Sequence, residues 1–98
     1  MKPVLVQAAA RRDLREAATW YRERNSEIAG RFVREVEHTL ELIERFPKTG
    51  ARISLVDGLA RRLLVAGFPY HVVFEDLIDR IEVLAIAHDR RRPGYWRG

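Results

Sequence analysis

The sequence predicts an α+β fold in which an N-terminal strand precedes an antiparallel two-helix hairpin that packs on an antiparallel sheet of about four strands. Two observations predict it. Apolar residues recur every three or four positions in the first half of the chain, which is typical of helices, and at every second position in much of the second half, which is typical of strands. The length of 98 residues, 47% of them hydrophobic, suits one domain over residues 1–98. This element order allows a single sheet with a helical hairpin on one face.

The N-terminal region is expected to form a short strand followed by an amphipathic helix. Val4–Val6 is a β-branched run that suits a strand. The helix is indicated by apolar residues that share one face: Ala10, Leu14, Ala17, Ala18 and Tyr21. Its start lacks a good cap, because alanines occupy positions 8–10, so we expect its first turn to fray.

The second helix carries the clearest apolar stripe in the chain. Its stripe consists of residues at helical spacing: Ile28, Phe32, Val36, Leu40 and Ile43. Ser26 is expected to cap its start, and Pro47 and Gly50 to end it. About two residues separate the helices, which favours an antiparallel hairpin.

Three further strands are expected at Leu59–Ala66, Phe68–Glu75 and Arg80–Ala87, and their short connections favour an antiparallel meander. Residues 48–58 between helix and meander are expected to form a loop with one extended stretch at 53–56. The middle strand alternates most cleanly, and one of its faces is aromatic and apolar: Phe68, Tyr70, Val72 and Phe74. This face is expected to meet the second helix and form the core.

Composition excludes several classes of function. The chain has no cysteine, which removes disulfides, thiolate metal sites and a cysteine nucleophile. Its N-terminal apolar run is too short for a signal peptide, and no segment approaches a membrane helix, so we expect a soluble, cytoplasmic protein without a membrane partner. His38 and His71 have no second ligand at metal spacing, and there is no glycine-rich phosphate loop. We therefore predict neither a metal nor a cofactor.

The positive charge is concentrated at the C-terminal end. The formal net charge is +4, and 16 of the 18 cationic residues are arginine. Residues 8–46 hold eight arginines and eight acids, whereas residues 80–98 hold five arginines and two acids. Arginine suits contact with phosphate, carboxylate or aromatic groups. A GC-rich genome would also raise the arginine content without any functional demand, and both explanations stay open.

The last predicted strand leads directly into a cationic, aromatic segment, Arg90–Trp96, which we call the tail. Three consecutive arginines followed by Pro-Gly-Tyr-Trp cannot all be buried, so we expect a partner outside the fold. Two alternatives remain: the arginines only keep the surface soluble, or the aromatic residues pack on the sheet. His88, at the end of the strand, is expected to be a structural polar residue, with a catalytic role as the alternative.

Eight short motifs occur in order along nearly the whole chain: Asp13-Leu14, Trp20-Tyr21, Gly30-Arg31-Phe32, Pro47-Lys48-Thr49-Gly50, Gly58 with Arg61-Arg62, Phe68–Phe74, Val83–His88 and Arg90–Trp96. On these motifs the chain resembles a toxin of the ParE branch of the RelE/ParE superfamily, the toxin halves of bacterial type II toxin-antitoxin pairs. The tail is the most specific of them.

This resemblance implies a set of partners. RelE-like members cut messenger RNA in the ribosome, whereas ParE-like members act on DNA gyrase and stop replication. Both are held inactive by an antitoxin whose C-terminal segment wraps the toxin. The implied partners are therefore a ParD-like antitoxin, DNA gyrase as the target, and operator DNA through the antitoxin alone.

The cationic residues favour the ParE branch. Metal-free RNA cleavage needs a base, phosphate-binding cations and an acid, and RelE-like nucleases are expected to take lysine and arginine from the sheet. The two lysines here, Lys2 and Lys48, lie outside the predicted strands, and arginine does not act as a base because it stays protonated. The leading hypothesis is a non-enzymatic gyrase inhibitor with no catalytic residue.

The hypotheses assign different residues to the site. Expected target contacts are those of the tail: Arg90, Arg91, Arg92, Tyr95 and Trp96. The alternative, a ribosome-dependent RNase, would use four residues: Arg61 and Arg90 on phosphate, with His88 and Tyr95 carrying protons. A third hypothesis is an inactive toxin that only regulates its operon.

Three apolar residues fall off the main stripes and are candidates for the antitoxin-binding surface: Val33, Leu42 and Leu63. An exposed groove made by them would suit an antitoxin helix and strand. A second core layer explains them equally well.

Overall fold

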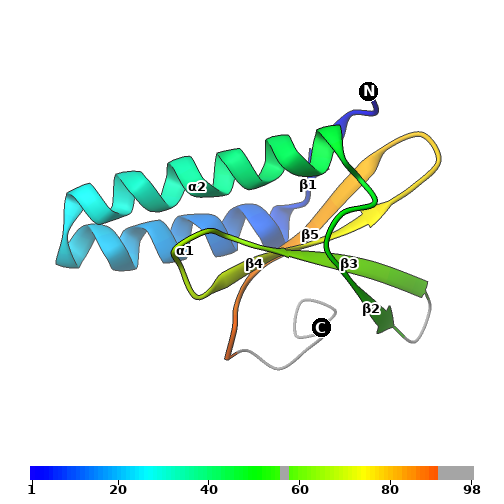
Figure 1. The fold of residues 1–98 in the computed structure, drawn as a ribbon. Coiled ribbons are helices and arrows are strands. Elements are labelled where there is room, and N and C mark those ends of the chain that lie inside the picture. The colour runs from blue at the N-terminus through cyan, green and yellow to red at the C-terminus, as the bar shows by residue number, and fades with distance from the viewer. Residues whose placement is uncertain (56–57, 91–98) are drawn as a thin grey trace.

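The computed structural model describes residues 1–55 and 58–90. The chain begins with β1 (Val4–Val6), which leads into the helices α1 (Ala8–Arg24) and α2 (Ser26–Arg45) (Figure 1). Four strands follow: β2 (Ala51–Leu55), β3 (Gly58–Leu64), β4 (Tyr70–Asp76) and β5 (Ile81–His88). The predicted order of strand, helical hairpin and meander is confirmed.

The strands form one mixed sheet of five strands in the order β1-β5-β4-β3-β2. β1 runs parallel to β5, and all other neighbours are antiparallel. The α+β prediction is therefore correct, although the sheet has one more strand than the expected four and is not purely antiparallel. The additional strand, β2, includes the extended stretch expected near residue 53 and lies at the edge of the sheet.

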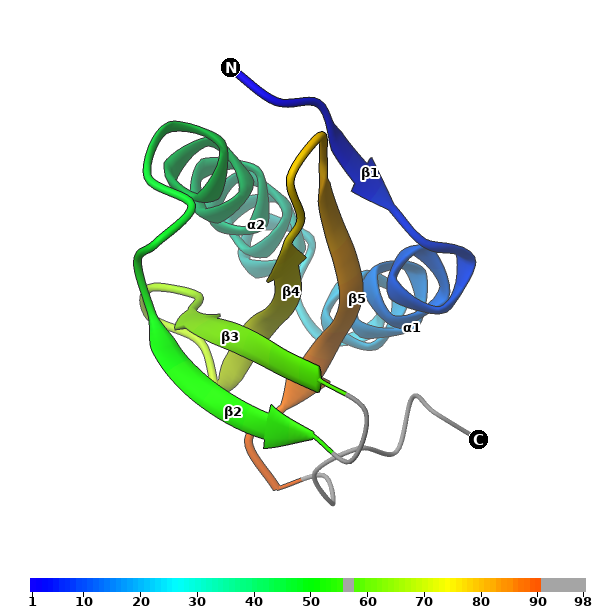
Figure 2. The ribbon, with the colours of Figure 1, turned by 90° about the vertical axis from the view of Figure 1, so that its right-hand side faces the viewer.

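Both helices cover the same face of the sheet (Figure 2). α1 lies against β5, while α2 lies over β3 and β4. The core between them combines the apolar stripe of α2 with the predicted face of β4: Phe32, Val36, Ile43, Val72 and Phe74 are fully buried. The rings of Phe32 and Tyr70 are 5.1 Å apart. The predicted contact between the second helix and the middle strand is confirmed.

The helix starts differ from the prediction at one position. Asn25, not Ser26, caps α2, because its Oδ1 accepts hydrogen bonds from the backbone N–H groups of Glu27 at 3.0 Å and Ile28 at 3.3 Å. Ser26 is the first helical residue, so its prediction as the cap was wrong. α1 starts after Gln7, which makes no side-chain capping bond, in agreement with the expected lack of a good cap.

A β-bulge in β5 decides which side chains face the helices. Val73 pairs with Ala85 but Phe74 pairs with Val83, so Leu84 is an extra residue on β5. Strict alternation would place Val83, Ala85 and every second residue after them on one face. The extra residue shifts this pattern by one, so that the residues after the bulge that face the helices are Ile86 and His88.

Candidate functional site

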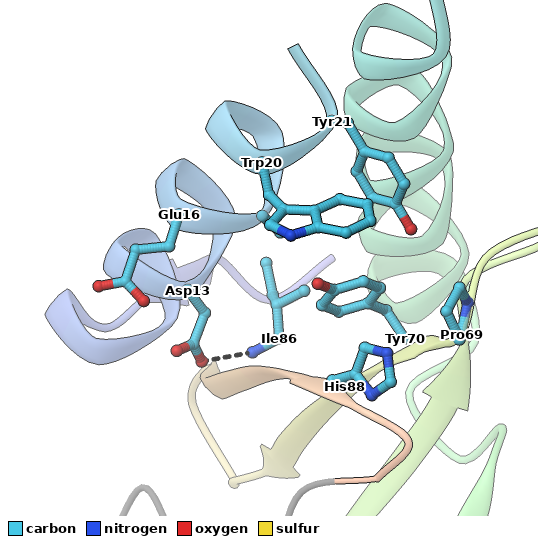
Figure 3. A pocket seen from close by; sticks show the side chains of 9 residues that line it. Asp13, Glu16, Trp20, Tyr21, Pro69, Tyr70, Ile86 and His88 are labelled. Atoms are coloured by element: carbon cyan, nitrogen blue, oxygen red, sulfur yellow. Dashed lines mark hydrogen bonds between the residues drawn. The ribbon is translucent and has the colours of Figure 1, made fainter. Parts of the chain in front are cut away.

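A pocket of about 430 Å³ opens between α1 and the end of the sheet where β4 begins and β5 ends (Figure 3). Its lining comes from three elements and the turn before β4: Asp13, Glu16, Ala17, Trp20, Tyr21, Pro69, Tyr70, Ile86 and His88. Ile86 and His88 reach the pocket because of the bulge at Leu84. The pocket therefore depends on both the helix and the irregular strand.

Aromatic rings make up much of the wall. Trp20 is 51% exposed, and the Tyr21 ring meets it edge-on with 5.1 Å between centroids. The Arg24 guanidinium stacks on the Trp20 ring, 3.7 Å from its centroid. On the sheet, the rings of Tyr70 and His88 lie 5.1 Å apart. Burial raises the pKa of the Tyr21 hydroxyl, so this phenol stays protonated at neutral pH.

Asp13 joins α1 to the strand beneath it. β1 pairs with β5 only as far as Val83, whose carbonyl accepts a further hydrogen bond from the Gln7 N–H at 3.0 Å. Beyond that point Asp13 Oδ2 accepts a hydrogen bond from the Ile86 N–H at 3.0 Å. A helix side chain thus takes the place of the missing strand partner. Glu16, one turn further along α1, is exposed at the rim of the pocket.

The start of the tail is fixed at the same rim. The Arg90 N–H donates to His88 Nδ1 at 3.1 Å, and the Asp89 N–H donates to the Pro69 carbonyl at 2.9 Å. The Asp89 carboxylate lies 3.0 Å from Nδ1 of His71, a residue only 8% exposed. The side chain of Arg90 is exposed. The other predicted tail contacts lie outside the described residues: Arg91, Arg92, Tyr95 and Trp96.

The residues of the RNase hypothesis are only partly brought together. His88 and Arg90 are in contact, whereas Arg61 pairs in register with Phe74 and His88 with Tyr70. Phe74 and Tyr70 are four residues apart on β4, which corresponds to roughly 13 Å along the strand. Arg61 and His88 are also separated sideways, because β4 lies between their strands. Arg61 instead donates through Nη1 to the Lys48 carbonyl at 2.8 Å. Tyr95, the fourth member, lies outside the described residues.

Both lysines are engaged at the opposite end of the sheet from His88. Lys2 bonds Asp76, and Lys48 Nζ lies 3.1 Å from the other oxygen of the same carboxylate. Asp76 pairs with Ile81 at the start of β5. The hydrogen bond from Lys2, supported by Lys48, lowers the pKa of Asp76 despite its burial. Neither lysine is therefore available near His88.

The three candidate antitoxin contacts have different surroundings. Val33 and Leu63 are half-buried and pack against the core, with Leu63 opposite Val72 in the sheet. Leu42 is 37% exposed on α2, and Phe46, just after the helix, is also exposed. Contact of these residues with an antitoxin stays a prediction.

The pocket itself was not predicted from sequence. Trp20 and Asp13 belong only to sequence motifs, and Tyr70 belongs to a motif and to the expected core face of its strand. The spacing of Asp13, Glu16 and Trp20 does place them on neighbouring turns of α1, which was the available signal. In residues 1–55 and 58–90, no three acidic or histidine side chains are grouped to hold a metal ion, and no helix is long and apolar enough to cross a membrane.

Comparison with known proteins identifies the family. Residues 4–93 match the family model described as "ParE toxin of type II toxin-antitoxin system, parDE". A search of curated proteins finds no match. A solved structure entitled "Chromosomal ParDE TA system from P. aeruginosa" has a similar fold: the TM-score is 0.77 at 21% identity, over 90% of this chain and 96% of that chain. Because the family model covers most of its length, the chain belongs to the ParE toxin family of type II toxin-antitoxin systems.

Proposed function

We propose that this chain inhibits DNA gyrase in the cytoplasm by docking on it without catalysing a reaction, and that a ParD-like antitoxin neutralises it. In this proposal the chain reaches operator DNA only through the antitoxin. The arrest of replication would inhibit growth and give the toxin its effect. Membership of the ParE family provides the context, and the arrangement of the cationic side chains supports the mechanism.

The positions of the cationic side chains favour docking over cleavage as the mechanism. An RNase site needs a base, an acid and phosphate-binding cations within reach of one phosphate. Here Arg61 and His88 are separated along β4, and Lys2 and Lys48 are both engaged by Asp76. Within the described part of the chain, His88 and Arg90 therefore lack the further cations that cleavage at a phosphate would need.

The proposed gyrase contact begins at Arg90 and continues through Arg91, Arg92, Tyr95 and Trp96. Arg90 is exposed, while its backbone is fixed to His88. A fixed starting point lowers the conformational entropy that the segment loses on binding. An excess of arginine favours an acidic protein surface as the partner, because guanidinium pairs with carboxylates in a bidentate geometry.

The proposed antitoxin contacts include Leu42, Val33 and Leu63. Leu42 is the most accessible of them, and the exposed Phe46 extends the apolar surface around it. An amphipathic segment of a partner binds such residues by burying them. The half-buried Val33 and Leu63 would contribute at the margins of that contact.

One pair of assays tests the function. Purified chain is added to gyrase with relaxed plasmid, and separately to ribosomes programmed with messenger RNA. Inhibited supercoiling with intact message is the expected result. Cut message with unaffected gyrase would replace the proposal with the RNase alternative. If neither assay responds, the inactive toxin that only regulates its operon becomes the better explanation.

A second assay tests the partner. The protein encoded by the adjacent reading frame is co-expressed with this chain, and the complex is isolated by affinity purification and size-exclusion chromatography. A stable complex that restores supercoiling is expected. The absence of a complex would reject the antitoxin half of the proposal without affecting the gyrase half.

A further inference from the structure

We propose that the pocket between α1 and the β4–β5 end of the sheet binds an arginine side chain of the antitoxin. This inference rests on the proposed antitoxin partner and deepens it by assigning a specific subsite. The pocket combines aromatic rings on two walls with carboxylates at one side, and no lysine or arginine is among its lining residues in the described part of the chain. Although the whole chain has a net charge of +4, the carboxylates make this pocket locally suited to a cation.

The shape of the pocket suits a flat group. Figure 3 shows the Trp20 indole and the Tyr70 ring on facing walls, with the Ile86 side chain between them. Guanidinium is planar and weakly hydrated, so it stacks on aromatic faces at little desolvation cost. The Trp20 ring already holds one guanidinium, that of Arg24, at 3.7 Å. A second guanidinium could stack on the side of the indole that lines the pocket.

The carboxylates supply the charge and the hydrogen-bond acceptors. Asp13 is held by the Ile86 N–H, which fixes its position beside the slot. Glu16 lies at the rim, exposed, and forms no ion pair within the part of the chain that the structure describes. A side chain that enters the slot passes these acids. An arginine can then combine stacking with charge-assisted hydrogen bonds.

Other occupants fit less well. A lysine ammonium is compact and strongly hydrated, so it gains less from two flat walls. A nucleobase could stack between Trp20 and Tyr70, but its phosphates would be repelled by Asp13 and Glu16. An apolar side chain would make no charge-assisted hydrogen bond to the exposed Glu16 carboxylate at the rim. The combination of ring faces and acids therefore favours arginine.

The location explains how occupancy could neutralise the toxin. His88 lines the pocket, and its Nδ1 accepts the hydrogen bond from the Arg90 backbone. An antitoxin anchored in the pocket would lie beside the first residue of the tail. Gyrase could then not reach Arg90 without displacing the antitoxin.

The test is a double-mutant cycle between the pocket and the antitoxin. Affinities of the adjacent-frame protein are measured for the wild-type chain, Trp20→Leu and Glu16→Gln, and then with each antitoxin arginine replaced by methionine. We expect each pocket variant to weaken binding about tenfold, and one antitoxin arginine to lose its contribution when Trp20 or Glu16 is changed. Asp79→Asn, an exposed acid in the turn at the other end of β4 and β5, is the matched control and should bind normally.

The outcomes separate this inference from the proposed function. If the antitoxin binds and no arginine couples to the pocket, or a lysine or aromatic residue couples instead, the inference is wrong while the partner stands. If the antitoxin does not bind, a small arginine derivative tests whether the pocket binds a guanidinium group. Nα-acetyl-arginine amide should shift the Trp20 indole N–H resonance at millimolar concentration, whereas the uncharged citrulline analogue should not. Equal shifts, or none, would overturn the inference.

Loss of folding must be distinguished from loss of binding. Trp20→Phe keeps an aromatic face and should restore much of the affinity that Trp20→Leu loses. Circular dichroism and thermal unfolding show whether each variant keeps the wild-type fold. A folded Trp20→Leu variant with wild-type affinity would contradict the proposal directly.

Discussion

The carboxylate of Asp13 on α1 accepts a hydrogen bond from the backbone N–H of Ile86 on β5, at 3.0 Å, across 73 positions of sequence. This bond lies where β1 no longer covers the edge of β5, so it replaces a strand partner with a side chain. It also holds Ile86 at the pocket. One interaction thus connects the packing of the helix to the geometry of the candidate site.

Replacing Asp13 should therefore destabilise the protein. Asp13→Ala leaves the Ile86 N–H without its acceptor, and we expect the free energy of unfolding to fall by about 1–3 kcal/mol. Asp13→Asn keeps an oxygen acceptor and should lose less. Urea denaturation followed by circular dichroism measures both. Wild-type stability of the alanine variant would show that the hydrogen bond contributes little.

The ion pairs of Asp76 should make stability depend on pH. Lys2 and Lys48 lower the pKa of Asp76 in the folded chain below the unfolded value of about 3.9. The stabilisation is therefore fully present above that value and is lost as the pH falls through the folded pKa. We expect Asp76→Asn to destabilise the protein by about 1–2 kcal/mol at pH 7, because removing the charge leaves two partly solvated lysines.

The difference between wild type and Asp76→Asn should shrink below about pH 4, because the carboxyl is protonated first in the unfolded chain and, at lower pH, in the folded chain. Denaturation curves from pH 2.5 to pH 7 provide the measurement. Asp79→Asn is a suitable control, because the Asp79 side chain is 69% exposed and its ion pair within the described residues is with its neighbour Arg80. A constant difference at all pH values would mean that Asp76 stabilises the fold by packing rather than by charge.

Two glycines offer a matched pair of substitutions. Gly50 has φ +85°, and a Cβ there would lie 2.3 Å from the Arg62 carbonyl oxygen. Gly67 has φ +79° with no atom within 4 Å of the same position. Gly67→Ala should cost about 1 kcal/mol, the price of the left-handed backbone alone. Gly50→Ala should cost clearly more, because the backbone of β3 must also move.

Thermal unfolding of the two glycine variants gives the comparison. The difference in melting temperature between the two variants reports the close approach of residue 50 to β3, since φ is nearly the same at Gly50 and Gly67. Similar melting temperatures for both variants would show that the segment before β2 shifts easily.

Much of the fold could be predicted because its central elements have strong patterns. The stripe of α2 and the alternation of β4 reflect contact with one continuous core. β2 was harder to predict, since an edge strand with exposed Arg52 and Ser54 needs no apolar alternation. Asn25 was missed as the cap because Ser26 is an equally good capping residue, and only the backbone geometry separates them.

The candidate site was less predictable because it depends on tertiary structure. The exposed position of Arg90 follows directly from the sequence, where an apolar strand ends in charged residues. The pocket, in contrast, requires the extra residue Leu84, which turns Ile86 and His88 toward α1. A single β-bulge leaves no pattern in an apolar run such as that of β5, so no periodicity argument could place these side chains.

Arg90 gives the sharpest test of docking against cleavage. Arg90→Ala removes the exposed guanidinium but keeps the backbone N–H that bonds His88 Nδ1, so the start of the tail stays in place. We expect inhibition of supercoiling to weaken about tenfold, as for an interface arginine. Arg45→Ala, in the last turn of α2, is the matched control and should inhibit normally, as should Arg61→Ala. In the RNase alternative, Arg61→Ala and Arg90→Ala would instead both reduce message cleavage on ribosomes, because both cations would stabilise the same phosphate.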